Sequence, residues 1–253
     1  MSLWRQEHPT WIVGHRGAPR RAPENTIASL DFAESFGVDG VEFDVRQTRD
    51  GEAVLFHDED ILLGTQRIPV KIYTSREIER LLIPSELGDF HIPRLENVFH
   101  RYGSALRYIV EVKTGPGTQL STMARRIAKL AHAYGVAERC LVASFDAEFI
   151  KRMREADKDI ATSYLFDHPI ALPAPGQPAP LFPPADAIAP RRDLVTPVLL
   201  SQAAAAGLSV HPWTVDDTEE IRSLLAAGVA SITTNAPDEA LLIRAGGPVR
   251  DTG

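Results

Sequence analysis

The sequence has little of several features, and each absence excludes a class of protein. It has one cysteine in 253 residues, so no internal disulfide can form. That residue, Cys140, lies in an apolar run that predicts a buried strand. No segment approaches the roughly 18 consecutive apolar residues of a membrane-spanning helix, and the N-terminus has no apolar run of signal-peptide length. We therefore expect a cytoplasmic protein without stable membrane insertion.

Positive charge is also scarce. The 27 lysines and arginines are outnumbered by 34 acidic residues, which gives a formal net charge of −7, and no basic patch is evident. Such a surface repels nucleic acid, so we expect no nucleic-acid partner. An anionic substrate would need a locally positive site, made from a cation and a few basic side chains. The sequence leaves the oligomeric state open.

The order of apolar segments predicts the fold. Short β-branched runs alternate with longer segments of helical period, a pattern typical of βα units around a parallel sheet. Eight segments read as strands of such a sheet: 11–15, 40–45, 107–111, 141–144, 161–165, 187–189, 208–213 and 231–233. Eight parallel strands close a TIM (β/α)8 barrel, and the chain length suits this fold as a single domain over residues 1–253.

Three helices have clear boundary signals. The first is expected over residues 25–36, with Asn25 as its start signal and Gly37 as its stop. The second follows an i, i+3, i+4, i+7 apolar pattern over residues 120–134. The third is expected to open at Asp216, with Glu219 as a carboxylate version of the capping box, and to close at Gly228.

Three stretches interrupt the alternation. The pair Asp50-Gly51 predicts a tight hairpin, so residues 53–56 should run antiparallel and lie outside the count of eight. Residues 60–93 are long for a loop, with helical character only over 75–82, and we interpret them as a short rim insertion after this hairpin. Residues 167–190 contain eight prolines, which disfavour helix. Because βα units resume afterwards, a loop replacing one helix is favoured over an interdomain linker.

Charged side chains occur in pairs on two predicted strands or directly after them. Glu42 and Asp44 lie two residues apart and therefore point to the same face, as do Glu111 and Lys113. Carboxylates are costly inside a parallel barrel unless positive charge neutralises them, and a hard divalent cation such as Mg²⁺ or Ca²⁺ does so. The alternative is an interior salt-bridge layer in which Glu42 pairs with Lys113 or an arginine. Three carboxylates against one lysine favour the metal.

Two histidines end strands beside these pairs. His15 or His57 alone would be an ordinary strand-end histidine bonded to a carbonyl group. Together they indicate an acid and a base, which cleavage of a phosphodiester requires. Arg16 and Lys113 could hold the phosphoryl oxygens. Other arginines are expected on the solvated surface: Arg20, Arg21, Arg191 and Arg192.

The ordered motifs of the chain resemble the glycerophosphodiester phosphodiesterase family. They are His15-Arg16-Gly17, Pro23-Glu24-Asn25-Thr26, Gly40 to Val45, Asp50-Gly51, His57-Asp58, Glu111-Val112-Lys113, Ser144-Phe145, Trp213-Thr214, Gly228-Val229 and Thr233 to Pro237. The resemblance implies a TIM barrel with metal ligands Glu42, Asp44 and Glu111. It further implies that His15 and His57 form the catalytic pair and that Arg16 and Lys113 contact phosphate.

Two further residues match the resemblance. Glu24 would orient Arg16 or bind a metal-bound water, with local helix capping as the alternative. Trp213 would pack against the glycerol moiety or act as an aromatic plug of the barrel. The chain departs from the family pattern at Leu62-Leu63-Gly64-Thr65, where arginine and threonine are common, and at Ala230-Ser231, where Asp-Gly is usual. The first departure lies in the rim that should select the alcohol group.

The resemblance implies metal-dependent hydrolysis of a glycerophosphodiester, a small-molecule substrate, to glycerol 3-phosphate and an alcohol. A lysophospholipase D type is an alternative, which would need an apolar groove from Ile61, Leu62, Leu63 or the proline-rich segment. A second alternative is a non-catalytic barrel that binds phosphate esters.

Overall fold

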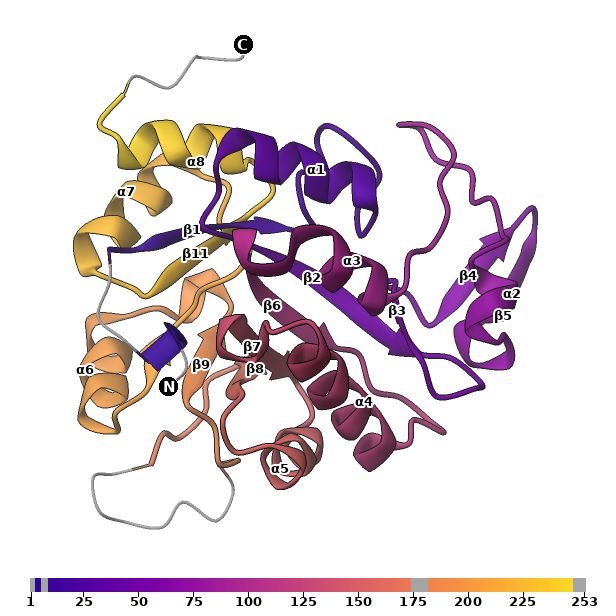
Figure 1. The fold of residues 1–253 in the computed structure, drawn as a ribbon. Coiled ribbons are helices and arrows are strands. Elements are labelled where there is room, and N and C mark those ends of the chain that lie inside the picture. Colours follow the sequence, from indigo (N-terminus) through magenta and orange to yellow (C-terminus); the bar gives the residue numbers. More distant parts are fainter. Residues whose placement is uncertain (1–2, 6–8, 174–181, 248–253) are drawn as a thin grey trace.

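Parallel strands surround a central axis in the computed structural model, which describes residues 3–5, 9–173 and 182–247 (Figure 1). Eight of them follow the order β10-β9-β8-β7-β6-β2-β1-β11. Their bounds are β1 (Trp11–His15), β2 (Gly40–Gln47), β6 (Arg107–Val112), β7 (Cys140–Ser144), β8 (Ala161–Phe166), β9 (Ala187–Pro190), β10 (Ser209–Val210) and β11 (Ser231–Thr234). This nearly closed, parallel arrangement confirms the predicted TIM barrel.

The strand predicted over residues 208–213 is wrong in length, because β10 covers only Ser209–Val210. Pro212 has no N–H to donate toward β11, so a regular ladder cannot form there. Two backbone bonds still join the outermost strands: Ala230 donates to the Val210 carbonyl at 2.9 Å and Thr233 donates to the Pro212 carbonyl at 3.1 Å. These bonds bring the barrel close to closure.

Helices cover the outside of the barrel (Figure 1). Among the described residues, every barrel strand except β8 is followed by one: α1 (Ile27–Phe36), α3 (Leu95–Tyr102), α4 (Leu120–Ala133), α5 (Ala147–Ala156), α6 (Pro197–Ala205), α7 (Thr218–Ala227) and α8 (Pro237–Arg244). Short 3-10 turns are η1 (Leu3–Arg5), η2 (Val70–Ile72), η3 (Gly103–Ala105), η4 (Ala137–Arg139) and η5 (Arg192–Leu194). The part of the proline-rich segment that is described contains no helix, as expected, while its residues 174–181 lie outside the described ranges.

Two predicted helix starts are wrong by one residue or more. The hydroxyl of Thr26, not Asn25, caps α1 by accepting the Ser29 N–H at 3.1 Å. Asp217, not Asp216, caps α7. In both cases the displaced residue has a tertiary partner instead. Asn25 bonds to Asp44, and Asp216 accepts two hydrogen bonds from Asn235, the residue that follows β11.

The predicted hairpin is present. β3 (Ala53–Leu55) pairs antiparallel with β2, and Gly51 in the turn has a φ of 81°. The insertion after it holds an unpredicted second hairpin, β4 (Asp60–Leu63) and β5 (Gln66–Pro69), while the helix expected over 75–82 is the single turn α2 (Ser75–Ile78). A small core fills the insertion, made of Ile61, Val70, Ile78, Ile83 and Ile92 packed on Val54 of β3.

Trp4 closes the barrel interior at the end where the strands begin. Trp4 of η1 packs edge-on against Trp11 and His211, with ring centroids 4.9 and 5.4 Å away. Cys140 is fully buried, as predicted, and burial raises the pKa of its thiol. The polar residues expected in the site gather at the carboxyl ends of the strands, where this fold builds its active sites. No helix among the described residues is long and apolar enough to cross a membrane.

Candidate active site

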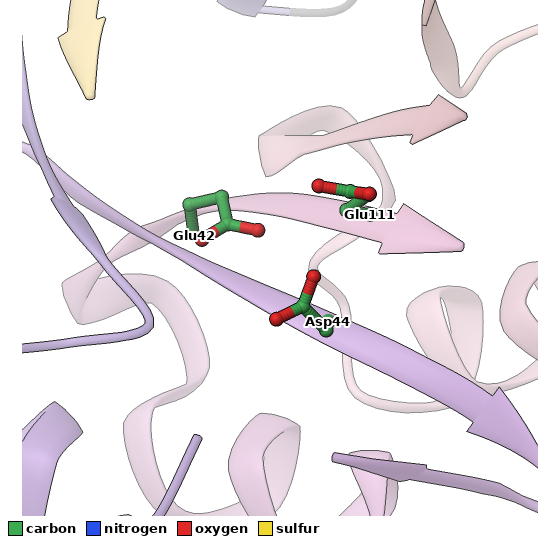
Figure 2. Close-up of side chains that lie close together, drawn as sticks. All are labelled: Glu42, Asp44 and Glu111. Atoms are coloured by element: carbon green, nitrogen blue, oxygen red, sulfur yellow. The ribbon is translucent and has the colours of Figure 1, made fainter. Parts of the chain in front are cut away.

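Three buried carboxylates converge at the carboxyl ends of β2 and β6. Glu42 and Asp44 point inward from β2, and Glu111 stands opposite Asp44 in the register of β6. One oxygen from each lies within 4.8 Å of the others, and Figure 2 shows the three groups turned toward one another. The period-two spacing therefore brings together the side chains predicted to bind a cation.

Cations and an amide compensate Asp44. Lys113 Nζ lies 3.0 Å from its Oδ1, and Arg16 Nε lies 3.0 Å from its Oδ2. Asn25 also donates its amide to Oδ2 at 2.8 Å and accepts the Asp44 N–H at 3.0 Å. Lys113 additionally forms an ion pair with Glu111. Lys113 therefore pairs with Asp44 and Glu111 rather than with Glu42, the partner that the salt-bridge alternative gave it.

The neighbouring cations do not fully compensate the negative charge of the three carboxylates. Burial and the neighbouring Asp44 raise the pKa of Glu42 to about 8 and that of Glu111 to about 7. For Asp44, burial acts to raise the pKa, but Lys113 and Arg16 together lower it. Glu42 Oε1 is buried without a hydrogen-bond partner. Since all three donors are carboxylate oxygens, the site fits a hard divalent cation.

A tight turn after β1 aims Arg16 into this cluster. The backbone of Arg16 has a φ of 53°, a left-handed conformation that is uncommon for residues other than glycine. Its N–H donates to Glu42 Oε2 at 3.0 Å, so both backbone and guanidinium face the carboxylates. Gly14 makes the turn possible, because a Cβ there would lie 2.2 Å from the Gly17 carbonyl oxygen.

Replacing Gly14 with alanine should therefore destabilise the protein by about 1–3 kcal/mol, the range typical of overpacking. The free energy of unfolding in urea measures this. Gly115→Ala is the matched control, because its Cβ would meet no atom closer than 4.0 Å. Equal unfolding free energies for the two variants would contradict the steric role of Gly14.

His15 lies beside the carboxylates with both ring nitrogens oriented. Its Nδ1 is 2.7 Å from Asn235 Oδ1, and its Nε2 is 3.8 Å from Glu42 Oε2. Burial, followed by the charge of Arg16, lowers the pKa of His15. The imidazole is therefore neutral near pH 7, a state in which it can accept a proton.

His57 occupies the rim, two residues beyond the end of β3. Its side chain is 39% exposed, and its Nδ1 lies 2.8 Å from Asp58 Oδ1. The backbone on both sides is tied to β2: the Phe56 N–H donates to the Asp44 carbonyl at 3.1 Å, and Arg46 Nε donates to the His57 carbonyl at 2.8 Å. The Asp50-Gly51 turn and these bonds together set the position of His57.

The remaining predicted site residues also have defined contacts. Glu24 Oε1 lies 2.6 Å from Arg16 Nη1, so its partner is Arg16, and the capping of α1 falls to Thr26. Trp213 donates its indole N–H to the Ala189 carbonyl at 2.8 Å and meets Phe145 edge-on. The four outlying arginines form ion pairs with acidic partners on the surface, as expected: Arg20, Arg21, Arg191 and Arg192.

Comparison with known proteins identifies the family of the chain. Residues 15–239 match the glycerophosphoryl diester phosphodiesterase family. The chain belongs to this family. A glycerophosphodiester phosphodiesterase of Caldanaerobacter subterraneus is 30% identical, covering 94% of this chain and 99% of that protein.

Solved structures agree with the assignment. The crystal structure of a glycerophosphodiester phosphodiesterase from Agrobacterium tumefaciens is 25% identical with a TM-score of 0.76, covering 94% of this chain and 99% of that one. A phosphodiesterase from Oleispira antarctica, in complex with the product sn-glycerol-3-phosphate, shares the fold with a TM-score of 0.78 at 22% identity, covering 93% and 96% of the two chains.

A pocket of this glycerophosphoryl diester phosphodiesterase runs from the carboxylates into the barrel. His15, Glu42 and Glu111 line it together with Trp213 and apolar side chains that include Leu141 and Leu165. The lining thus combines polar side chains of the carboxylate cluster with apolar side chains of the barrel interior.

Sequence reasoning missed three polar residues at or beside the candidate site. Asn25 was assigned to a helix start although it is buried against Asp44. Arg46 continues the inward row of Glu42 and Asp44, so the period-two spacing could have identified it. His211 lines the pocket and bonds to Ser209 and Ser231, and its place within the strand predicted over 208–213 was the available signal.

Proposed function

We propose that this protein hydrolyses glycerophosphodiesters to glycerol 3-phosphate and an alcohol. One divalent cation, Mg²⁺ or Ca²⁺, would be held by Glu42, Asp44 and Glu111, with His15 and His57 as the acid-base pair. The observation that carries the proposal is the convergence of three buried carboxylates beside His15 and Lys113. Family membership supports the reaction class.

When bound, a hard cation acts as a Lewis acid toward phosphoryl and hydroxyl oxygens. Arg16 and Lys113 would hold the nonbridging oxygens of the phosphodiester. Both are prepared for this task, because Glu24 and Asp44 fix the guanidinium while Glu111 and Asp44 fix the ammonium. Positioned donors of this kind stabilise charge that develops on phosphorus-bound oxygens.

The two histidines would move the protons. One removes the proton of the nucleophile as its oxygen bonds to phosphorus, and the other protonates the alkoxide as its bond to phosphorus breaks. A water oxygen and the neighbouring glycerol hydroxyl both satisfy this scheme, the second through a cyclic phosphate. Because His57 lies where the insertion begins, the insertion would contact the departing alcohol. Trp213 would cover the glycerol carbons.

Burial within the stretch 61–63 favours a small alcohol over an acyl chain. Ile61 is fully buried in the core of the insertion and Leu63 packs against it, which leaves only Leu62, 52% exposed, of the three residues suggested for a lipid groove. The full set of acidic and basic groups argues against a non-catalytic barrel. We also propose that the chain forms one domain, because β2, which belongs to the barrel, pairs with β3, on which the insertion packs.

A chelation experiment tests the proposal. Protein freed of metal should turn over none of glycerophosphocholine, glycerophosphoethanolamine and glycerophosphoglycerol, and addition of Mg²⁺ or Ca²⁺ should restore activity. Lysophosphatidylcholine, assayed beside glycerophosphocholine, should be the poorer substrate. Full activity in the chelated protein would contradict the cation, and a preference for lysophosphatidylcholine would contradict the small alcohol.

A further inference from the structure

Two residues outside the predicted site form a hydrogen-bonded chain that ends on His15. Asn235 Oδ1 lies 2.7 Å from His15 Nδ1, and Asn235 Nδ2 donates to Asp216 Oδ2 at 2.7 Å. The fold creates this contact, because β1 and β11 are neighbours and Gly14 stands opposite Thr234 in their register. The residues that follow these two positions, His15 and Asn235, therefore meet at the barrel mouth.

Asp216 also holds the backbone of the segment that carries Asn235. Its Oδ1 accepts the Asn235 N–H at 2.8 Å and the Thr234 hydroxyl at 3.0 Å. Burial acts to raise the pKa of Asp216, but the hydrogen bonds from Asn235 and Thr234 lower it. Asp216 is therefore a carboxylate near pH 7 and can only accept hydrogen bonds.

The chemistry of the three groups fixes the direction of each bond. Because the Asp216 carboxylate accepts, the Asn235 amide must turn its NH2 toward Asp216 and its oxygen toward His15. An amide oxygen can only accept, so His15 Nδ1 must carry the proton. The lone pair of the neutral ring is then on Nε2, the nitrogen that faces Glu42 at 3.8 Å.

We propose that Asp216 and Asn235 are a positioning pair that holds His15 in the Nδ1–H tautomer, with Nε2 directed at the reacting groups. The inference rests on the proposed function, since it assumes that His15 transfers a proton there. It makes His15 suited to accept the proton of the nucleophile and leaves protonation of the alkoxide to His57. Neither member of the pair contacts the carboxylate cluster in the hydrogen bonds and ion pairs of the described residues.

The pair is tested with Asn235→Ala and Asp216→Asn. In the first variant His15 loses its acceptor, and in the second the Asn235 amide is free to turn over. Both should lower kcat for glycerophosphocholine by about 10- to 100-fold, the usual cost of removing an orienting partner, while KM changes little. Asp217→Asn is the matched control, because it removes the adjacent charge but keeps a good cap for α7.

Two readouts separate positioning from a structural role. Long-range ¹H–¹⁵N NMR spectra should show the Nδ1–H tautomer of His15 in the parent protein and in Asp217→Asn, and a mixture in Asn235→Ala and Asp216→Asn. Asn235→Ala should also cost nothing further when it is added to His15→Ala, because its effect passes through His15. An additional loss in the double variant, or an unchanged tautomer in both single variants, would overturn the positioning pair.

The same set of variants separates this inference from the function on which it rests. If His15→Ala retains full activity, the acid-base pair of the proposed function is wrong. If His15→Ala is inactive while Asn235→Ala and Asp216→Asn retain full kcat, the proposed function stands and only the positioning pair is wrong.

Discussion

His15→Ala and His57→Ala should each lower kcat for glycerophosphocholine by about 10²- to 10⁴-fold, the usual contribution of one general acid or base. His15 has its ring held between Asn235 and Glu42, and the chain at His57 is bonded to β2 on both sides. Both side chains are partly exposed, 16% for His15 and 39% for His57. The variants should therefore fold normally, which circular dichroism and urea unfolding check.

A substrate whose leaving group needs no protonation distinguishes the roles of the two histidines. p-Nitrophenolate departs without being protonated, so a variant that lacks the general acid should still cleave the p-nitrophenyl ester of glycerol phosphate. We expect His57→Ala to retain most of its turnover on this ester and His15→Ala to lose turnover on both substrates. His168→Ala, at an exposed histidine paired with Asp167, is the control and should be fully active. Full activity of either active-site variant on glycerophosphocholine would refute the acid-base assignment.

Glu42→Gln should abolish most activity and at the same time stabilise the metal-free protein. The charge of Glu42 is only partly compensated by Arg16 and Lys113, as its pKa of about 8 indicates, and glutamine removes the cost of burying it beside Asp44. Loss of a ligand should weaken cation binding by at least about 10²-fold, because loss of a residue that only orients a ligand already costs up to that factor. The metal-free variant should gain about 0.5–2 kcal/mol in free energy of unfolding at pH 9, where the parent carboxyl is ionised.

Calorimetric titration with Mg²⁺ or Ca²⁺ and urea unfolding in a chelator measure the two effects. Glu86→Gln is the control, because it removes the same charge from an exposed position of the insertion. A Glu42→Gln protein that binds the cation as tightly as the parent would remove Glu42 from the set of ligands. A loss of stability without metal would show that Glu42 supports the fold rather than strains it.

The sequence predicted best what depends on a repeating pattern. Alternation of strands and helices gave the barrel, and the spacing of two between Glu42 and Asp44 placed both carboxylates on the inner face of one strand. The hairpin followed from the Asp50-Gly51 pair, because few residue pairs suit a tight turn between strands. Each of these features is set by neighbours in the chain.

Features set by distant partners could not be predicted in this way. Asn25 and Asp216 are residue types that cap helices, so local rules assigned them to helix starts. In the structure Asn25 bonds to Asp44, 19 residues away, and Asp216 bonds to Asn235, also 19 residues away. The length of β10 likewise depends on which neighbour Pro212 faces, and the floor of the barrel depends on where Trp4 packs.

The insertion of residues 60–93 leaves and rejoins the barrel at nearly the same point. The Leu55 N–H at the end of β3 donates to the carbonyl of Pro93 at 2.8 Å, and Val54 pairs with Arg94. The insertion also has an apolar core of its own. Exchanging it between relatives would therefore need two adjoining junctions, together with the bonds that Tyr73 and Ser75 make to Arg49 and Asp50. Under the proposed function, such chimeras should change the choice of alcohol while the carboxylates on β2 and β6 stay in place.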